Sequence, residues 1–469
     1  MNVPLFRPAL VATASLIAGI SEAISVPVVT QDQNRLVTVT YSLDADAIVT
    51  MEVLTNSAVQ VDAANYWNVE GDVNKLVKAG GTKTITWQPD VAWPVDNLAT
   101  GLKVKLTAWP SNKPPLYMVV NLDSTTGKDI RYYASSNAIP GGIFGSPCYR
   151  DMKMVFRRID AKGVAWTMGY GADDRGRQVP VTLDNDYWLG IFEVSRGQWY
   201  AVRGEVTVDA NLGTFWAMRP YAGVPFTTIR EGATNVQNDD YDYPNPPHSS
   251  SFLGILRTRT GVAFDLPSEA QWEFGARSGL AINVNNTGVG NWNDIDVFPG
   301  RIRENGGKVP DGSGGYRDPT PDEAKMPEWG VAPIGSYEPN LWGIYDAQGN
   351  VRELCLDHYA ALHTDKPSDL TASGGVYKVS SGSHTRVARG NNWDAVAFNN
   401  MLWSRGSYDD TSTAYQVGFR VACTIPAGDA EPISAESVIE PIETRGVWQT
   451  LSAAGKLLWS KLGFMLIFR

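Results

Sequence analysis

Residues 343–357 read GIYDAQGNVRELCLD and place several oxygen ligands close together along the chain. The side chains of Asp346 and Glu353 and the backbone carbonyls of Gly349 and Val351 fall within eight residues. Hard cations such as Ca²⁺ prefer oxygen ligands of this kind. Two interpretations are therefore open from these residues alone: a calcium site, or a tight turn followed by the start of a helix.

Four further motifs lie in order on either side of this stretch. They read GVAWTMGYG at 163–171, DYWLGIFEVSRGQWYAV at 186–202, FDLPSEAQWEFGARSG at 264–279 and RGNNWDAVAFNNMLWSRGSYDDTSTAYQVGFR at 389–420. The five motifs together resemble the formylglycine-generating enzyme, or sulfatase-modifying factor, family, and the resemblance covers residues 150–425. It implies an α+β fold related to C-type lectins, with much irregular loop and with the ends of the domain on adjoining strands.

The segment LPSEAQWEFGAR at 266–277 predicts a structural helix. Ser268 can cap the first turn, and Glu269 then lies at the positive end of the helix dipole. Charged residues in such motifs, here Glu193 and Arg277, are more often ion pairs or exposed groups than catalytic acids and bases. We therefore predict no catalytic residue in these motifs.

The segment from about Val26 to Leu122 alternates apolar with polar residues, which predicts a small all-β sandwich over residues 26–122. The alternating runs occupy residues 35–43, 47–54, 82–87, 101–109 and 115–122. No catalytic constellation occurs in this segment, so a spacer or adhesion module is expected. The Gly, Ser and Pro residues at 135–147 then lead into the second domain, predicted to span residues 148–426.

The two ends of the chain have compositions of their own. Residues 1–23 combine an early arginine, an apolar run and a small-residue ending, which predicts a signal peptide and a protein that is secreted or held in the periplasm or bacterial cell envelope. Residues 427–443 are acidic and Pro-containing and predict a linker. Residues 444–469 predict an amphipathic helix that contacts a protein or a membrane surface.

Charge and cysteine content exclude further classes. The formal net charge is −10 and there is no basic run, which argues against a nucleic-acid partner. Three cysteines, at positions 148, 355 and 423, exclude a disulfide scaffold and contain no zinc-type spacing. Because the resemblance brings the ends of the domain together, we predict a disulfide between Cys148 and Cys423.

The resemblance also favours calcium at residues 343–357. The family binds a structural Ca²⁺ at this motif through an Asn or Asp, two backbone carbonyls and a Glu. The matching positions here are Asp346, Gly349, Val351 and Glu353. The sequence departs from the family at Arg352 and Leu354, where tryptophan is usual.

The known redox chemistries of the superfamily lack their ligands in this sequence. Formylglycine-generating enzymes oxidise a substrate cysteine with O₂ and a copper ion held by two cysteines in the interval before Gly-Phe-Arg. Copper(I) needs soft thiolate ligands, and residues 394–417 contain none, so copper is not predicted. A sulfoxide-forming branch uses iron held by histidines, but the four histidines here form no recognisable ligand set: His248, His358, His363 and His384.

The interval 389–420 is instead rich in aromatic and short polar side chains, a mixture typical of binding surfaces. Variable proteins of diversity-generating retroelements, which share this fold, vary the same interval. The predicted ligand-binding residues are Trp393, Asp394, Phe398, Asn399, Trp403, Tyr408, Asp409 and Tyr415. We also expect Trp393 and Phe419 to pack in the core.

Three functions remain open from the sequence. The first is a secreted module that binds a protein or a glycan and has no formylglycine-generating activity. The second is an oxidoreductase of the family that acts on a protein cysteine with a rearranged metal site. The third is a structural envelope protein anchored by residues 444–469.

Overall fold

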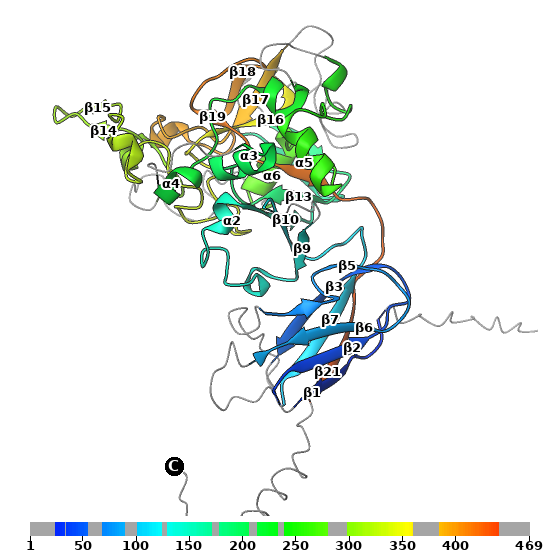
Figure 1. The fold of residues 1–469 in the computed structure, drawn as a ribbon. Helices are drawn as coiled ribbons and strands as arrows, with labels where there is room; N and C mark the ends of the chain where they lie inside the picture. Colours follow the sequence, from blue (N-terminus) through cyan, green and yellow to red (C-terminus); the bar gives the residue numbers. More distant parts are fainter. Residues whose placement is uncertain are drawn as a thin grey trace, which may run out of the picture.

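The computed structural model describes residues 24–32, 34–54, 68–89, 101–123, 129–170, 178–205, 213–232, 239–279, 298–359 and 384–439. The predicted signal peptide (1–23) and the predicted C-terminal helix (444–469) lie outside the described residues. Within the described ranges, no helix is long and apolar enough to cross a membrane. Figure 1 shows an all-β domain joined to a larger domain of strands, short helices and loops.

The all-β domain consists of two four-stranded sheets, ordered β1-β2-β6-β4 and β21-β7-β3-β5. Its strands are β1 Val28–Gln31, β2 Val37–Tyr41, β3 Ala47–Leu54, β4 Glu70–Gly71, β5 Lys75–Val77, β6 Lys83–Trp87, β7 Lys103–Trp109 and β21 Ile433–Val438. Alternate side chains point inward, and Val37, Trp87 and Leu106 are fully buried in one shared core. The predicted period-two pattern therefore produces a two-sheet domain.

The prediction of a linker at 427–443 is wrong, because β21 forms within it. β21 pairs antiparallel with β7, from Ile433 opposite Ala108 to Val438 opposite Lys103. Acidic residues that suggested a solvated linker form ion pairs with lysines instead, and Glu436 lies 2.9 Å from Lys103. The chain thus returns from the second domain to complete the first, as Figure 1 shows.

The predicted domain boundary between Leu122 and Cys148 is also wrong. Strand β8 (Tyr117–Asn121) pairs with strands of the second domain rather than with the all-β domain. Tyr117 and Val119 face one core of that domain, and Met118 and Val120 face the other. A strand buried on both faces belongs in the middle of a sheet, and the boundary therefore lies before Tyr117.

The second domain contains a five-stranded sheet, β20-β13-β10-β8-β9, and a four-stranded sheet, β18-β17-β16-β19. Their remaining strands are β9 Ile130–Tyr133, β10 Lys153–Ile159, β13 Tyr187–Gly190, β16 Arg352–His358, β17 Thr385–Arg389, β18 Arg405–Asp409, β19 Val417–Gly418 and β20 Ala422–Thr424. Two short hairpins are β11 Ala165–Met168 with β12 Val179–Thr182, and β14 Val309–Pro310 with β15 Tyr316–Arg317.

Short helices complete the domain. They are α2 Cys148–Asp151, α3 Arg196–Arg203, α4 Gly213–Ala217, α5 Phe252–Thr260 and α6 Glu269–Ala276, with single turns η2 Ser136–Ala138, η4 Thr227–Glu231, η5 Asp239–Tyr241, η7 Arg303–Gly307, η8 Glu323–Lys325 and η9 Ala397–Asn399. The predicted helix after Ser268 is confirmed as α6. Ser268 and Gln271 form a reciprocal capping box, which satisfies two backbone donors at the start of the helix.

The predicted disulfide between Cys148 and Cys423 is not formed, and all three cysteines are free. Cys148 packs against the core on one face of the five-stranded sheet. Cys423 packs in the core on the other face. The first and last strands of the domain, β8 and β20, are not adjoining as expected, because β10 and β13 lie between them in the sheet. The sheet also separates the two cysteine side chains.

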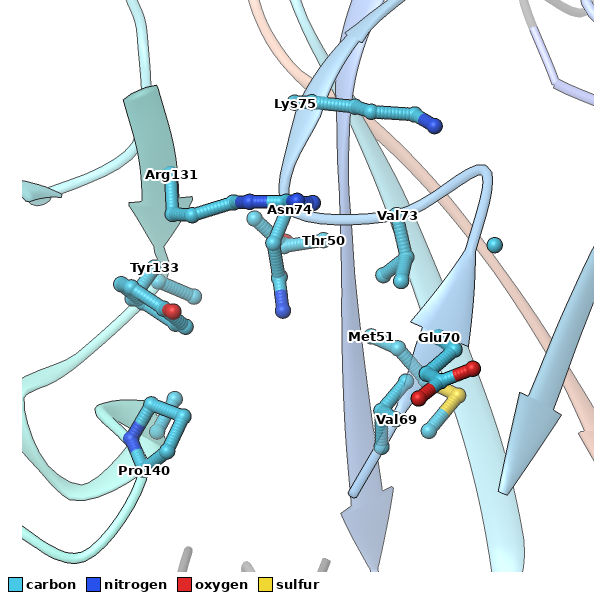
Figure 2. Close-up of a pocket in the computed structure, with 13 residues that line it drawn as sticks. Thr50, Met51, Val69, Glu70, Val73, Asn74, Lys75, Arg131, Tyr133 and Pro140 are labelled. Carbon is cyan, nitrogen blue, oxygen red and sulfur yellow. The ribbon is translucent and has the colours of Figure 1, made fainter. Parts of the chain in front are cut away.

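The two domains meet beside β9. The Tyr132 amide donates to the carbonyl of Asn74 across the junction at 2.9 Å. A cavity of about 460 Å³ lies next to this contact. Figure 2 shows Arg131 and Tyr133 from β9 on one side of it, facing Thr50 and Asn74 of the all-β domain.

Candidate functional site

The stretch that follows Gly349 forms a strand, so the alternative of a helix start is wrong. β16 begins at Arg352 and pairs with β17 on one side and with β19 on the other. Glu353 is fully buried and its carboxylate pairs with Arg420 of the Gly-Phe-Arg motif, with Nη2 at 2.5 Å. The Trp272 indole of α6 donates to the same carboxylate at 2.7 Å. Three distant motifs therefore meet at one buried carboxylate.

This arrangement fits only part of the predicted calcium site. Glu353 already accepts hydrogen bonds on both oxygens from Arg420 and Trp272, so it does not fit as a calcium ligand. Asp346 does fit, because its Oδ2 accepts from the Gly335 amide at 2.6 Å and its buried Oδ1 has no partner. No group of three or more His, Cys, Asp or Glu residues suited to a metal occurs within the described ranges.

The cysteines do not fit a copper site. Burial raises the pKa of the Cys355 thiol well above its usual range, and it raises the pKa of Cys423 to about 12. Copper(I) is bound by the thiolate form. None of the three cysteines lies in the interval 394–417, and Cys148 lies in α2.

Two of the histidines, His358 and His384, lie beside one buried ion-pair cluster. His358 is buried in β16, with Nε2 3.0 Å from Asp242. His363 lies outside the described residues. Burial alone would raise the pKa of Asp242, but the hydrogen bond from His358 and the charge of Arg386 outweigh burial and hold this pKa below its ordinary value. His358 therefore belongs to a buried ion-pair cluster and not to a loop.

A layer of buried ion pairs lies beneath the interval 389–420. Arg405 of β18 donates to both oxygens of Glu269 at 2.6 and 2.7 Å. Glu273 pairs with Arg277 at 2.5 Å and also with Arg389. These pairs hold α6 against β17 and β18. Arg277 thus forms a buried ion pair, one of the two kinds of environment expected for it.

A hollow of about 610 Å³ opens over this layer, and we call it the interval hollow. Its walls are Arg352, Asn391, Asn392, Asp394, Ala395, Asn399, Met401, Trp403, Ser404, Arg405, Tyr408 and Gln416. All of these residues except Arg352 lie in the interval 389–420. Amide, hydroxyl, aromatic and guanidinium groups therefore face one space large enough for a small ligand or the end of a larger one.

Arg352 supplies an unpaired positive charge to the interval hollow. Its Nε and Nη2 donate to Oδ1 of Asn391 at 3.1 and 2.6 Å, and its Nη1 lies 3.4 Å from the Tyr408 hydroxyl. The guanidinium also lies 5.9 Å from the centre of the Tyr408 ring. An amide and a phenol hold the side chain in place, and no carboxylate within the described ranges forms an ion pair with it. The hollow thus favours ligands with hydrogen-bond acceptors.

The predicted binding residues divide into separate groups. Asp394, Asn399, Trp403 and Tyr408 line the interval hollow. Trp393 and Tyr415 line a neighbouring cavity, and Trp393 is only 5 % exposed, in agreement with its expected place in the core. Phe419, at 1 % exposure, is also core as predicted. Asp409 is exposed, and its carboxylate accepts hydrogen bonds from the amide and the hydroxyl of Thr411. The side chain of Phe398 lies outside the described residues.

Sequence reasoning missed several walls of the hollow, above all Arg352 and Asn391. Arg352 stands where the resembled family usually has tryptophan, and this departure was the available signal. Asn391 has a positive φ of 59°, which asparagine tolerates better than most residues. Its Nδ2 also donates to the Asn399 carbonyl at 2.7 Å, so it fixes both Arg352 and the wall.

A family model of the sulfatase-modifying factor enzyme 1-like domain matches residues 162–425, more than half of the chain. The chain belongs to this family. The matched region contains the five motifs, the buried Glu353–Arg420 pair and the whole interval hollow.

Several curated relatives share this domain. The chaperone protein LppX of Paenibacillus barcinonensis is 25% identical over 51% of this chain and 81% of its own length. A formylglycine-generating enzyme of Streptomyces coelicolor is 30% identical over 34% of this chain. The inactive C-alpha-formylglycine-generating enzyme 2 of Bos taurus is 36% identical over 21%. This chain spans only 46% and 29% of the last two relatives.

Solved structures give a weaker likeness. Treponema denticola variable protein 1 aligns with 59% of this chain and 96% of its own, at 19% identity and a TM-score of 0.37. PvdO from Pseudomonas aeruginosa aligns with 58% of this chain and 94% of its own, at 19% identity and a TM-score of 0.38. The family assignment comes from the sequence match.

Proposed function

We propose that this chain is an extracytoplasmic binding protein of the sulfatase-modifying factor family, which holds a protein or glycan ligand in the interval hollow and does not generate formylglycine. The observation that supports this most directly is the composition of the hollow. The interval in which the resembled enzymes keep two copper-binding cysteines here contributes amides, aromatic rings and a hydroxyl to a ligand-sized space.

The chemistry of the walls suits recognition. Tyr408 and Trp403 offer rigid aromatic area at low entropic cost, and Asn399 offers an exposed amide. Arg352 adds a charge that is already positioned by Asn391, so little side-chain entropy is lost when a ligand binds. The buried ion pair of Arg405 with Glu269 keeps the floor rigid.

Array screening of the full chain tests this proposal. Peptide and glycan arrays should return saturable ligands, and Tyr408→Ala should weaken the best of them by about tenfold or more, as is usual for a central aromatic contact. Asn399→Ala, at an exposed position, should weaken it without changing stability.

Tyr316→Ala is the matched control for this screen, because Tyr316 is an exposed tyrosine on the β14–β15 hairpin. It should bind as the unmodified protein does. The proposal fails if neither array returns a ligand, or if the interval variants bind as well as Tyr316→Ala.

The second candidate is a family oxidoreductase acting on a protein cysteine through a rearranged metal site. The matches to proteins named formylglycine-generating enzyme favour it, and the match to a protein named as inactive favours the binding function. Titration with copper(I) in the presence of a sulfatase-type cysteine peptide separates the two. Stoichiometric copper and aldehyde formation would replace the binding proposal with the enzymatic one.

Calcium at residues 343–357 is kept as a proposal with Asp346 as its side-chain ligand. Chelation with EDTA should then lower the melting temperature of the full chain, and added Ca²⁺ should restore it. Asp346→Asn should remove this response. An equal melting temperature in EDTA and in Ca²⁺ would exclude a structural calcium ion.

Export and membrane contact complete the proposal. Residues 1–23 would be removed on export, and residues 444–469 would contact a membrane surface. Fractionation of cells that express the full chain or residues 1–443, with N-terminal sequencing of the mature protein, tests both points. Cytoplasmic accumulation of the uncleaved chain would contradict the proposed location.

A further inference from the structure

A second cavity, of about 520 Å³, lies on the other side of the segment that contains Trp393 and Asp394. We call it the arginine cavity. Among its walls are Arg196 at the start of α3, Trp216, Arg219, Pro319, Trp393 and Tyr415. Its walls are more apolar than those of the interval hollow, and its volume is within the usual range of small-molecule sites.

The backbone places Arg196 and Arg219 side by side. The Arg196 amide donates to the Arg219 carbonyl at 2.8 Å, and Ser195 forms an antiparallel bridge with Pro220. Arg219 is 8 % exposed, and two of its nitrogens are fixed by the carbonyls of Ala324 and Met326. The two guanidinium groups are therefore built into the wall of the cavity.

Neither arginine forms an ion pair with a carboxylate in the part of the chain that is described. The Arg196 guanidinium has no hydrogen-bond acceptor there and lies 5.0 Å over the ring of Trp216. The Nε atoms of Arg196 and Arg219 are buried without partners. A partly buried guanidinium without a counter-charge is costly, and an anion in the cavity would offset this cost.

The pKa values are consistent with an uncompensated positive site. Burial lowers the pKa of Arg196. Burial lowers the pKa of Arg219 to about 10, with smaller contributions from the nearby charges of Arg196 and Arg301. The charge of Glu328 opposes this shift only in part.

The other charges at the cavity largely cancel. Asp318 lies 2.5 Å from Lys308 and its side chain is mostly exposed. Lys325 lies 2.9 Å from Asp322. Arg196 and Arg219 are thus the charged lining residues that have no ion-pair partner among the described residues.

The remaining walls suit a ring rather than a bare ion. Tyr415 is 55 % exposed, so its ring is open to a ligand. Pro319 and Pro321 add rigid apolar surface. Aromatic and proline surfaces pack against the C–H faces of a sugar ring, while the arginines match a carboxylate.

We propose that the arginine cavity binds an acidic sugar, with its carboxylate at Arg196 and its ring against Tyr415. This site is separate from the interval hollow, and binding in it does not depend on the function proposed above. It would give the protein affinity for uronic-acid-containing polysaccharides.

Calorimetric titration of the full chain with glucuronate tests this inference. Saturable binding is expected, and Arg196→Gln should weaken it by about tenfold or more, since a charge-assisted contact is lost. Tyr415→Ala should also weaken it. Arg203→Gln is the matched control on the same helix, outside the cavity, and should bind as the unmodified protein does.

Four measurements that leave the cavity unchanged complete the test. Glucose should bind at least about tenfold more weakly than glucuronate, acetate should not saturate the site, and rising NaCl should weaken glucuronate binding. Tyr408→Ala should leave glucuronate binding intact. The inference is overturned if glucuronate does not bind, if glucose or acetate binds equally well, if salt has no effect, or if Tyr408→Ala abolishes binding.

Discussion

Arg420→Met removes the guanidinium that compensates Glu353 in the core of the second domain. Arg420 is 1 % exposed and Glu353 is fully buried, so water cannot replace the lost partner. Breaking a buried pair from one side costs about 3–5 kcal/mol. The carbonyls of Gly190 and Tyr345 also lose donors at 3.0 and 2.9 Å, at about 1 kcal/mol each, and the methionine side chain recovers part of this by apolar contact.

The expected loss in the free energy of unfolding is therefore about 4 kcal/mol, or roughly 10 °C in melting temperature for a domain of this size. Urea denaturation and calorimetry of the full chain measure it. Lys162→Met is the control, because its pair with Asp429 is exposed and should cost less than about 1 kcal/mol.

Replacing Glu353 with leucine as well should recover part of the loss, because no charge is then left buried alone. If Arg420→Met costs no more than Lys162→Met, the buried pair does not hold the motifs together.

Three further outcomes follow from the fold. Deletion of residues 431–469 should make the N-terminal domain sensitive to protease because β7 loses one of its two partner strands, β21, whereas deletion of 440–469 should not. Dithiothreitol should leave the melting temperature unchanged because Cys148 and Cys423 are free, and a drop would show a disulfide. The folded-state pKa of Asp242 is depressed, so its contribution to stability is fully present above the ordinary carboxyl pKa and is lost as the pH falls through the folded-state pKa. Asp242→Asn should therefore reduce the loss of stability in acid, as measured by urea midpoints from neutral pH into strong acid.

Local signals in the sequence predicted the elements that depend on local physics. Ser268 caps α6 because its hydroxyl reaches a backbone amide three residues away, which any chain with this spacing can do. The period-two runs formed strands because the alternation of apolar and polar residues is also a local signal. The motif order located the interval hollow, because the family resemblance fixes which segments lie near the Gly-Phe-Arg strand.

Other features depended on partners far away in sequence. Residues 427–443 contain a strand because β7 pairs with Ile433–Val438, and Lys103 of β7 compensates Glu436, the one acidic residue of β21. Glu353 pairs with Arg420 because β16 and β19 lie in parallel, which brings the two side chains into one buried space. Arg352 lies in the wall of the hollow because the side-chain oxygen of Asn391 accepts hydrogen bonds from its guanidinium.

Motifs and periodicities within short stretches are enough to assign the family, the main helix and the β-rich N-terminal segment. Tertiary contacts set which strand joins which sheet, which carboxylates are paired, and how six of the predicted binding residues divide between two cavities. Pairing and burial are set by residues from 39 to 333 positions apart, and a single sequence contains no direct measure of the distances between them in space.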